Sequence, residues 1–186
     1  EDVPNVLMLE SPLISYLHKT FKVTHNSLNG NNPQLQLKEY YLKWLKQTKT
    51  SDTKYFAKSM LHYLEKTKNN GFNLLINAVL LTYDDDLYNP EKSIELMNNA
   101  SDVIFNRQIT NEFYTELKYF LKLLEGFLYL KSSNLEKSNK SFYEALDLKH
   151  NGLTAKFHLA LTEIQLDNLS LATELVEEIY NTDVSR

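Results

Sequence analysis

Histidines are the residues of this 186-residue chain best suited to chemistry near neutral pH, because imidazole can bind a metal or move a proton there. None of them stands in a His-x-x-x-His or His-Glu-x-x-His register, so the sequence predicts no zinc site on a helix. The chain also has no Cys, which removes thiolate chemistry, disulfides and sulfur-ligated zinc. The five histidines are His18, His25, His62, His150 and His158.

Carboxylates offer two further candidates. The run Asp84-Asp-Asp86 could hold a divalent cation, but it lacks the alternating ligands, Gly and distal Glu of a calcium loop, so we interpret it as an exposed acidic turn. Glu125 interrupts an apolar stretch and needs a partner if it is buried, and Lys122 is within reach on a helix. No phosphate-binding loop or Gly-x-Ser-x-Gly elbow occurs. We predict no catalytic residue, metal or cofactor; an enzyme built from scattered residues is the alternative.

The composition predicts an all-α protein that would position these residues. Only four Gly and four Pro are present, and Leu, Lys and Glu are abundant. The stretch 119–130 is apolar nearly all round a helix, so we expect it to be covered on several sides. It is too short, and has too many charges inside and beside it, to cross a bilayer. We therefore expect a buried central helix and no membrane span.

Turn-forming residues divide the chain. Asn29-Gly-Asn-Asn-Pro33 predicts a break between a lead helix with its linker, residues 1–30, and the rest, residues 31–186. We predict one structural domain for the latter, made of hairpins at 33–68, 71–106, 110–150 and 152–183, with about nine helices in all. Asn89-Pro90 predicts a helix start. Lys149-His-Asn-Gly152 predicts a helix stop, with Asn or Gly in the left-handed conformation.

Small residues recur at a fixed separation near the C-terminus. Gly126 and Ala160 are separated by the same length of chain as Ser138 and Ala172, and we call this length the repeat distance. It resembles the spacing of tetratricopeptide repeats, about 34 residues, in which small residues lie where the two helices of each hairpin cross. The resemblance implies antiparallel hairpins stacked as an α-solenoid. Looser matches extend it to earlier hairpins, through Ala78, Ser93, Met97 and Ala100, and then Leu45, Ala57, Leu61 and Leu64.

The chain departs from the family pattern at several positions. Lys122 and Lys156 stand where the first signature aromatic belongs, and Glu163 corresponds to Tyr129. No Pro closes either C-terminal repeat. A different helical bundle or another type of α-solenoid is therefore the alternative fold.

The resemblance also implies a binding surface, because the first helix of each repeat lines the concave side. Leu123 and Phe127, or Phe157 and Leu161, stand where chaperone-binding repeats use Lys and Asn, so a carboxylate clamp is not expected. An apolar groove suits a helix or an extended apolar peptide. The alternative is that N-terminal helices or a second copy fill the groove. The implied partner-binding residues are Phe120, Leu123, Phe127, Leu130, Lys131, Phe157, Leu161, Ile164 and Gln165.

Charge is distributed unevenly along the chain. Residues 1–70 hold ten Lys and six acidic residues, a net charge of +4, whereas residues 71–186 carry −8. We interpret the basic part as solvated lysines and expect no nucleic acid partner, because no Arg cluster occurs and the lysines fall opposite an aromatic stripe. These lysines are Lys38, Lys43, Lys46 and Lys49.

The sequence as a whole predicts a protein–protein interaction module with a protein or peptide partner. Two alternatives stay open: a sensory or regulatory fragment of a larger protein, and a self-associating structural adaptor that forms homodimers. The compartment is open too, although a soluble, cytoplasmic protein is favoured over an exported one. The Asn-x-Ser sequons occur at about the chance frequency and give no indication of secretion. They begin at Asn99, Asn139 and Asn168.

Overall fold

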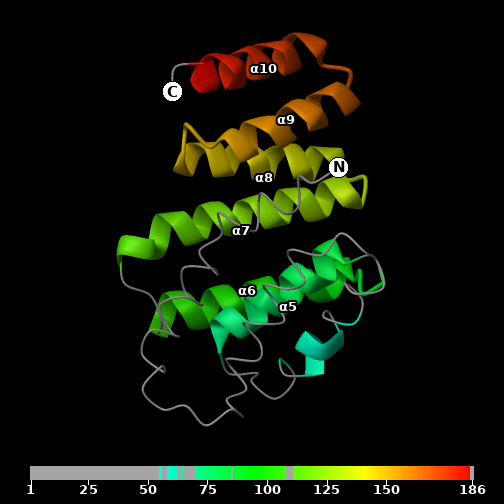
Figure 1. Cartoon of the computed structure of the whole chain (residues 1–186), viewed down its shortest axis with the longest axis vertical. Helices are drawn as coiled ribbons and strands as arrows, with labels where there is room; N and C mark the ends of the chain where they lie inside the picture. Colours follow the sequence, from blue (N-terminus) through cyan, green and yellow to red (C-terminus); the bar gives the residue numbers. More distant parts are fainter. Residues whose placement is uncertain are drawn as a thin grey trace. The chain divides into compact units, whose positions relative to one another are not determined.

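The computed structural model describes residues 55, 58–62, 64, 70–84, 86–107 and 111–184. Among these residues every regular element is helical and none is a strand, which confirms the all-α class. The predicted lead helix and most of the predicted 33–68 hairpin lie outside the described residues, so the count of nine helices stays a prediction. The helices (Figure 1) are α5 (Gly71–Tyr83), α6 (Pro90–Arg107), α7 (Asn111–Lys131), α8 (Leu135–Leu148), α9 (Leu153–Gln165) and α10 (Leu169–Val184).

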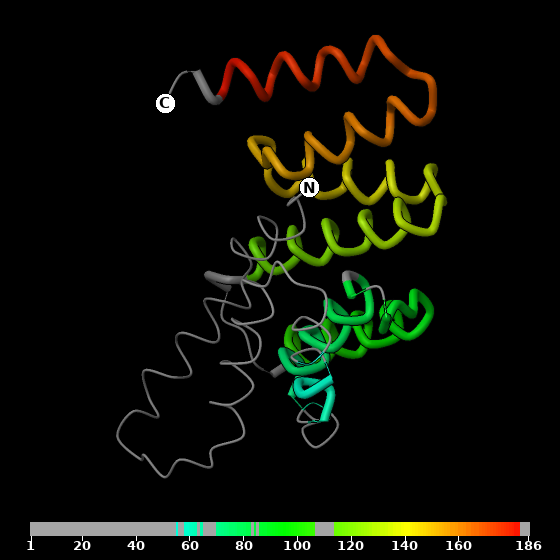
Figure 2. The backbone as a smooth tube through the Cα atoms, turned by 45° about the vertical axis from the view of Figure 1, so that its right-hand side comes forward, coloured from blue at the N-terminus to red at the C-terminus, as the bar shows by residue number. Residues whose placement is uncertain are grey.

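Backbone contacts divide the chain into two compact units, Glu1–Thr110 and Asn111–Arg186. We predicted a single domain over residues 31–186, whereas this division falls at the start of the third predicted hairpin. In the first unit, α5 packs against α6. In the second unit, α7 to α10 pack in consecutive order, one above the next in Figure 2, and α7 also touches α9.

Asparagine side chains begin helices in the first unit. The Asn89 side-chain oxygen accepts a hydrogen bond of 3.0 Å from the backbone N–H of Lys92, so the predicted start of α6 at Pro90 is confirmed. The Asn70 side-chain oxygen accepts one of 3.0 Å from the backbone N–H of Phe72. Asn70 therefore caps α5, which begins at Gly71, the first residue of the predicted 71–106 hairpin.

A buried serine ties the two helices of a hairpin together in each unit. Ser93 Oγ of α6 donates a hydrogen bond of 2.9 Å to the carbonyl oxygen of Ala78 in α5. In the second unit, Ser138 Oγ of α8 donates one of 2.9 Å to the carbonyl oxygen of Gly126 in α7. A Cβ on Gly126 would lie only 2.6 Å from Cε1 of Phe142, so the Phe142 ring packs directly on the backbone of α7 at this position. Small residues thus lie where the helices of these two hairpins cross, as predicted.

The α7–α8 and α9–α10 turns have the same backbone conformation. Each contains a non-glycine residue in the left-handed region, Ser133 with φ of 59° and Asp167 with φ of 63°, and these two are separated by the repeat distance. Such a residue after a helix lets the next amides bond back to the last turn. In both turns the following amide donates to the carbonyl five residues earlier, at 2.8 Å: Asn134 to Tyr129 and Asn168 to Glu163.

The turn between α8 and α9 differs from the prediction. α8 ends at Leu148, which confirms the predicted helix stop. The left-handed conformation expected at Asn151 or Gly152 was wrong, because Asn151 has no positive φ and Gly152 has φ of −70°. Gly152 is required for space instead: a Cβ there would lie 2.5 Å from the Tyr119 hydroxyl oxygen. The glycine lets this turn lie directly against α7.

Candidate functional site

The nine predicted partner-binding residues fall into three groups by exposure. Two on α7, Phe120 and Leu123, are buried. Three further along α7 are half-buried, and four on α9 are exposed. The half-buried residues are Phe127, Leu130 and Lys131; the exposed ones are Phe157, Leu161, Ile164 and Gln165.

The exposed apolar residues of α9 form one line, which we call the α9 stripe: Phe157, Leu161 and Ile164. Their spacing of four and then three residues places them on one helix face. Their exposed fractions are 39, 36 and 48%, respectively. The opposite face holds Ala155 and Leu159, both fully buried. α9 therefore contributes to the core on one side and presents apolar surface on the other.

A buried histidine connects this stripe to α7. His158 is 2% exposed, and its ring stacks on that of Phe142 of α8, with centroids 5.4 Å apart and an interplanar angle of 14°. Phe127 of α7 meets the same imidazole edge-on at 5.7 Å, and Phe157 does so at 5.4 Å. The structure thus brings Phe127 and Phe157 to one ring, at a point where α7, α8 and α9 meet.

His158 is uncharged at neutral pH and belongs to the core. Burial lowers its pKa from 6.5 to about 4. Neither Nδ1 nor Nε2 has a hydrogen-bond partner among the described residues. From the sequence we considered this residue only as a possible metal ligand. The phenylalanines around it come from three separate helices, so the spacing of residues along the chain could not predict the cluster. Among the described residues, no three His, Cys, Asp or Glu side chains lie close enough together to hold a metal ion.

A buried carboxylate fastens α8 to the end of α9. Glu163, at the position that corresponds to Tyr129, accepts hydrogen bonds from three neutral donors: Asn139 Nδ2 at 2.6 Å, Asn168 Nδ2 at 3.1 Å and the Tyr143 hydroxyl at 3.4 Å. Partial burial, followed by the charge and hydrogen bond of Glu163, raises the pKa of the Tyr143 hydroxyl. The departure from the repeat pattern at Glu163 is therefore accommodated by a polar network.

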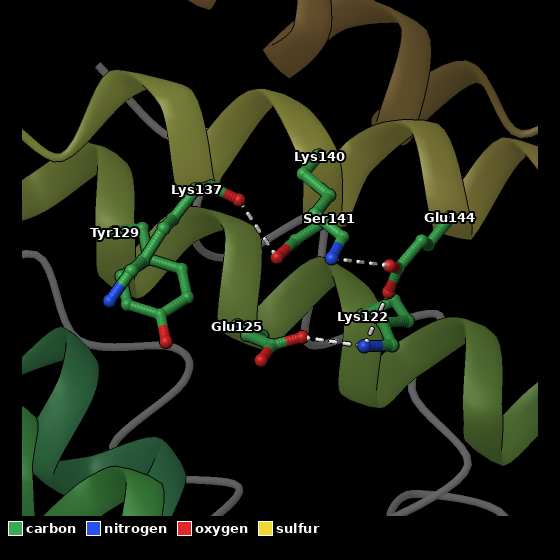
Figure 3. A pocket seen from close by; sticks show the side chains of 7 residues that line it. All are labelled: Lys122, Glu125, Tyr129, Lys137, Lys140, Ser141 and Glu144. Atoms are coloured by element: carbon green, nitrogen blue, oxygen red, sulfur yellow. Dashed lines mark hydrogen bonds and ion pairs between the residues drawn. The ribbon is translucent and has the colours of Figure 1, made fainter.

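A charged cavity of about 230 Å³ lies between α7 and α8 (Figure 3). On α7 its lining residues are on the face opposite Phe127, so it is separate from the α9 stripe. Lys122 Nζ lies 2.9 Å from a carboxylate oxygen of Glu125, which confirms the predicted pair, although Glu125 is partly exposed rather than buried. The cavity is lined by Lys122, Glu125, Tyr129, Lys137, Lys140, Ser141 and Glu144.

Ion pairs already satisfy much of this cavity. Lys122 Nζ also lies 2.6 Å from Glu144, which Lys140 approaches at 3.8 Å. Partial burial alone would lower the pKa of Lys122, but the hydrogen bonds and charges of Glu125 and Glu144 outweigh burial and raise it. The hydrogen bond from Lys122 lowers the pKa of Glu144, against a smaller opposing effect of burial. Both lining carboxylates, Glu125 and Glu144, are paired with lysines, and one of these pairs joins the two helices, so we interpret the cavity as an ion-pair network.

None of the described helices has both the length and the apolar content that a membrane crossing needs. The chain matches no protein-family model, no curated protein and no solved structure. The arrangement of its own residues is therefore the basis on which a function can be proposed, and the α9 stripe is the candidate site.

Proposed function

We propose that this chain is a protein–protein interaction module that binds a helix or an extended apolar segment of a partner on the α9 stripe. The exposed line of Phe157, Leu161 and Ile164 carries this proposal. A line of apolar side chains at this spacing matches the apolar face of a partner helix. Phe127 adjoins the stripe, because it packs on the same imidazole as Phe157.

The apolar area sets the expected strength of binding. Fully burying one large apolar side chain contributes about 1.5–3 kcal/mol, and between one third and one half of each stripe residue is available. The three residues together then contribute about 2–4 kcal/mol to the free energy of binding, before the entropic costs of association are subtracted. Contacts with half-buried Phe127 and Leu130 of α7 must add to this, so the partner extends across both helices.

We also propose that the second unit is built from tetratricopeptide-like repeats. The identical turns at Ser133 and Asp167 support this interpretation, because they recur at the repeat distance. The burial of Ala160 and Ala172 supports it as well, since these residues correspond to Gly126 and Ser138. In such an array the first helices of successive repeats lie side by side, which agrees with the contact between α7 and α9.

Selection from a displayed library of helical peptides tests the binding site. Selected peptides are measured by fluorescence anisotropy against the wild-type chain and against Leu161→Glu and Ile164→Glu. Each charge should weaken binding at least about tenfold, because a carboxylate would be desolvated under the bound helix. Leu166→Glu is the matched control, since Leu166 is exposed to a similar extent but lies outside the stripe.

Two results would contradict the proposal. The first is equal affinity for all three variants and the wild type. The second is a stable wild-type dimer by light scattering that Leu161→Glu converts to a monomer, which would assign the stripe to a second copy of the chain. Circular dichroism must show that each variant keeps the helical content of the wild type.

A further inference from the structure

A second exposed apolar line runs along α10, which we call the α10 stripe: Leu169, Val176 and Tyr180. Their spacing of seven and then four residues places them on one helix face. Their exposed fractions are 59, 52 and 68%, whereas Ala172 and Leu175 on another face are buried. Single exposed apolar residues are ordinary, but three aligned on one helix are typical of a contact surface.

The equivalent face of α8, in the preceding hairpin, is covered by another helix. Each residue of the α10 stripe corresponds to a residue of α8 that lies one repeat distance earlier in the chain, and none of these α8 residues is exposed. That side of α8 holds α9: Phe142 stacks on His158, and Asn139 Nδ2 donates to Glu163. The face of α10 that is exposed is thus equivalent to a face of α8 that binds a helix. The pairs are Leu135 and Leu169, Phe142 and Val176, and Leu146 and Tyr180.

The charge of α10 differs from that of α8, so the helix that would pack on α10 must differ in charge from α9. The sequence of α10 contains four acidic residues and no Lys or Arg, whereas α8 contains both signs. Glu177 flanks the stripe, at the position of Tyr143 in α8, whose hydroxyl donates a hydrogen bond to Glu163 of α9. Nucleic acid and anionic lipid would be repelled, and two copies meeting through this face would bring acidic residues together. A partner with charge complementary to the acidic α10 is therefore basic.

We propose that the outer face of α10 binds a basic amphipathic helix of a partner protein, in the way that α8 holds α9. Apolar side chains of the partner cover Leu169, Val176 and Tyr180, while its Lys or Arg residues lie near Glu177. This surface is separate from the α9 stripe and is independent of the function proposed for that stripe.

Three labelled helical peptides of equal length test the proposal against the 186-residue chain by fluorescence anisotropy. The first has an apolar line flanked by Lys, the second has the same line flanked by Glu, and the third has the composition of the first with its apolar positions scrambled. The first should bind at least about tenfold more tightly than the other two, because it alone has both the stripe and the charge. Its affinity should fall as salt is raised.

Variants locate the binding site on the protein. Val176→Lys should weaken the binding of the first peptide at least about tenfold, and Glu177→Lys should weaken it about threefold. Two controls carry matched charge changes elsewhere: Leu166→Lys, which lies outside both stripes, and Glu136→Lys on the exposed side of α8 should leave the affinity unchanged. Val176 and Glu177 are exposed, so these variants are expected to stay folded.

Four results would overturn the proposal. One is equal binding of the three peptides, and another is wild-type affinity in Val176→Lys. The third is a wild-type dimer in sedimentation that Val176→Lys dissociates, which would make a second copy the occupant. Loss of binding in Leu161→Lys but not in Val176→Lys would also reject the α10 site, while agreeing with a peptide site on the α9 stripe.

Discussion

Replacing His158 by Phe should reduce the loss of stability that acid causes. The folded-state pKa of His158 is about 4, below the value of about 6.5 that an unfolded chain gives. Between these values the unfolded chain binds a proton that the folded chain does not, so the free energy of unfolding falls as pH falls. The complete loss is about 3 kcal/mol, and about 2 kcal/mol of it occurs between pH 7 and pH 5.

Urea unfolding at pH 7 and pH 5 measures this loss. The wild type should lose about 2 kcal/mol more than His158→Phe over this interval, because the other titrating groups are common to both proteins. Any misfit of the larger ring affects both pH values alike and cancels in the difference. His150→Gln is the matched control, because it removes an exposed histidine that lies after the end of α8.

Nuclear magnetic resonance gives an independent measurement, since the imidazole shifts of His158 report its folded-state pKa. A value near 6.5, or equal losses of stability in the wild type and His158→Phe, would refute the idea that the aromatic cluster disfavours the charged ring. A lowered pKa with the expected difference in stability would support it.

Three other substitutions test the packing of the second unit, each by its urea midpoint. Gly126→Ala should destabilise by about 1–3 kcal/mol, because its Cβ would meet Phe142 at 2.6 Å; a gain in stability, as at an exposed helical Gly, would be contrary to this packing. Ser138→Ala should cost about 1 kcal/mol by removing the bond to Gly126, and no loss would mean that this bond contributes nothing. Lys122→Met should cost at most about 1 kcal/mol, since the ion pair is partly exposed, and a cost that persists at about 1 M salt would contradict an electrostatic origin.

Local signals in the sequence were enough to predict the helices of the described residues. Pro90 and its cap Asn89 mark the start of α6, because their effect depends only on neighbouring backbone groups. The small residues Gly126 and Ser138 indicated a helix crossing, since any large side chain there would hold the helices apart. Features that depend on one or two turns of helix are therefore readable from the chain alone.

Features that depend on contacts between several helices could not be predicted from the sequence. His158 gave no signal, because its ring partners come from helices that only the fold brings together. Ser133 and Asp167 take left-handed conformations in which Gly is favoured, so residue type pointed instead to Gly152. The sequence predicted a buried central helix at 119–130, but the repeat resemblance assigned Phe120 and Leu123 to a binding surface, since an apolar residue gives the same signal in a core and at a binding surface.

The matching turns at Ser133 and Asp167 have a consequence for how the chain can change in length. A segment bounded by these two positions starts and finishes in the same local conformation, with the same hydrogen bonds on either side. Duplicating or excising it would join ends that already fit together and would keep every later helix in phase. Insertions of any other size would rotate the following helix away from its neighbour, so growth of this unit by whole multiples of the repeat distance is the route that disturbs its packing least.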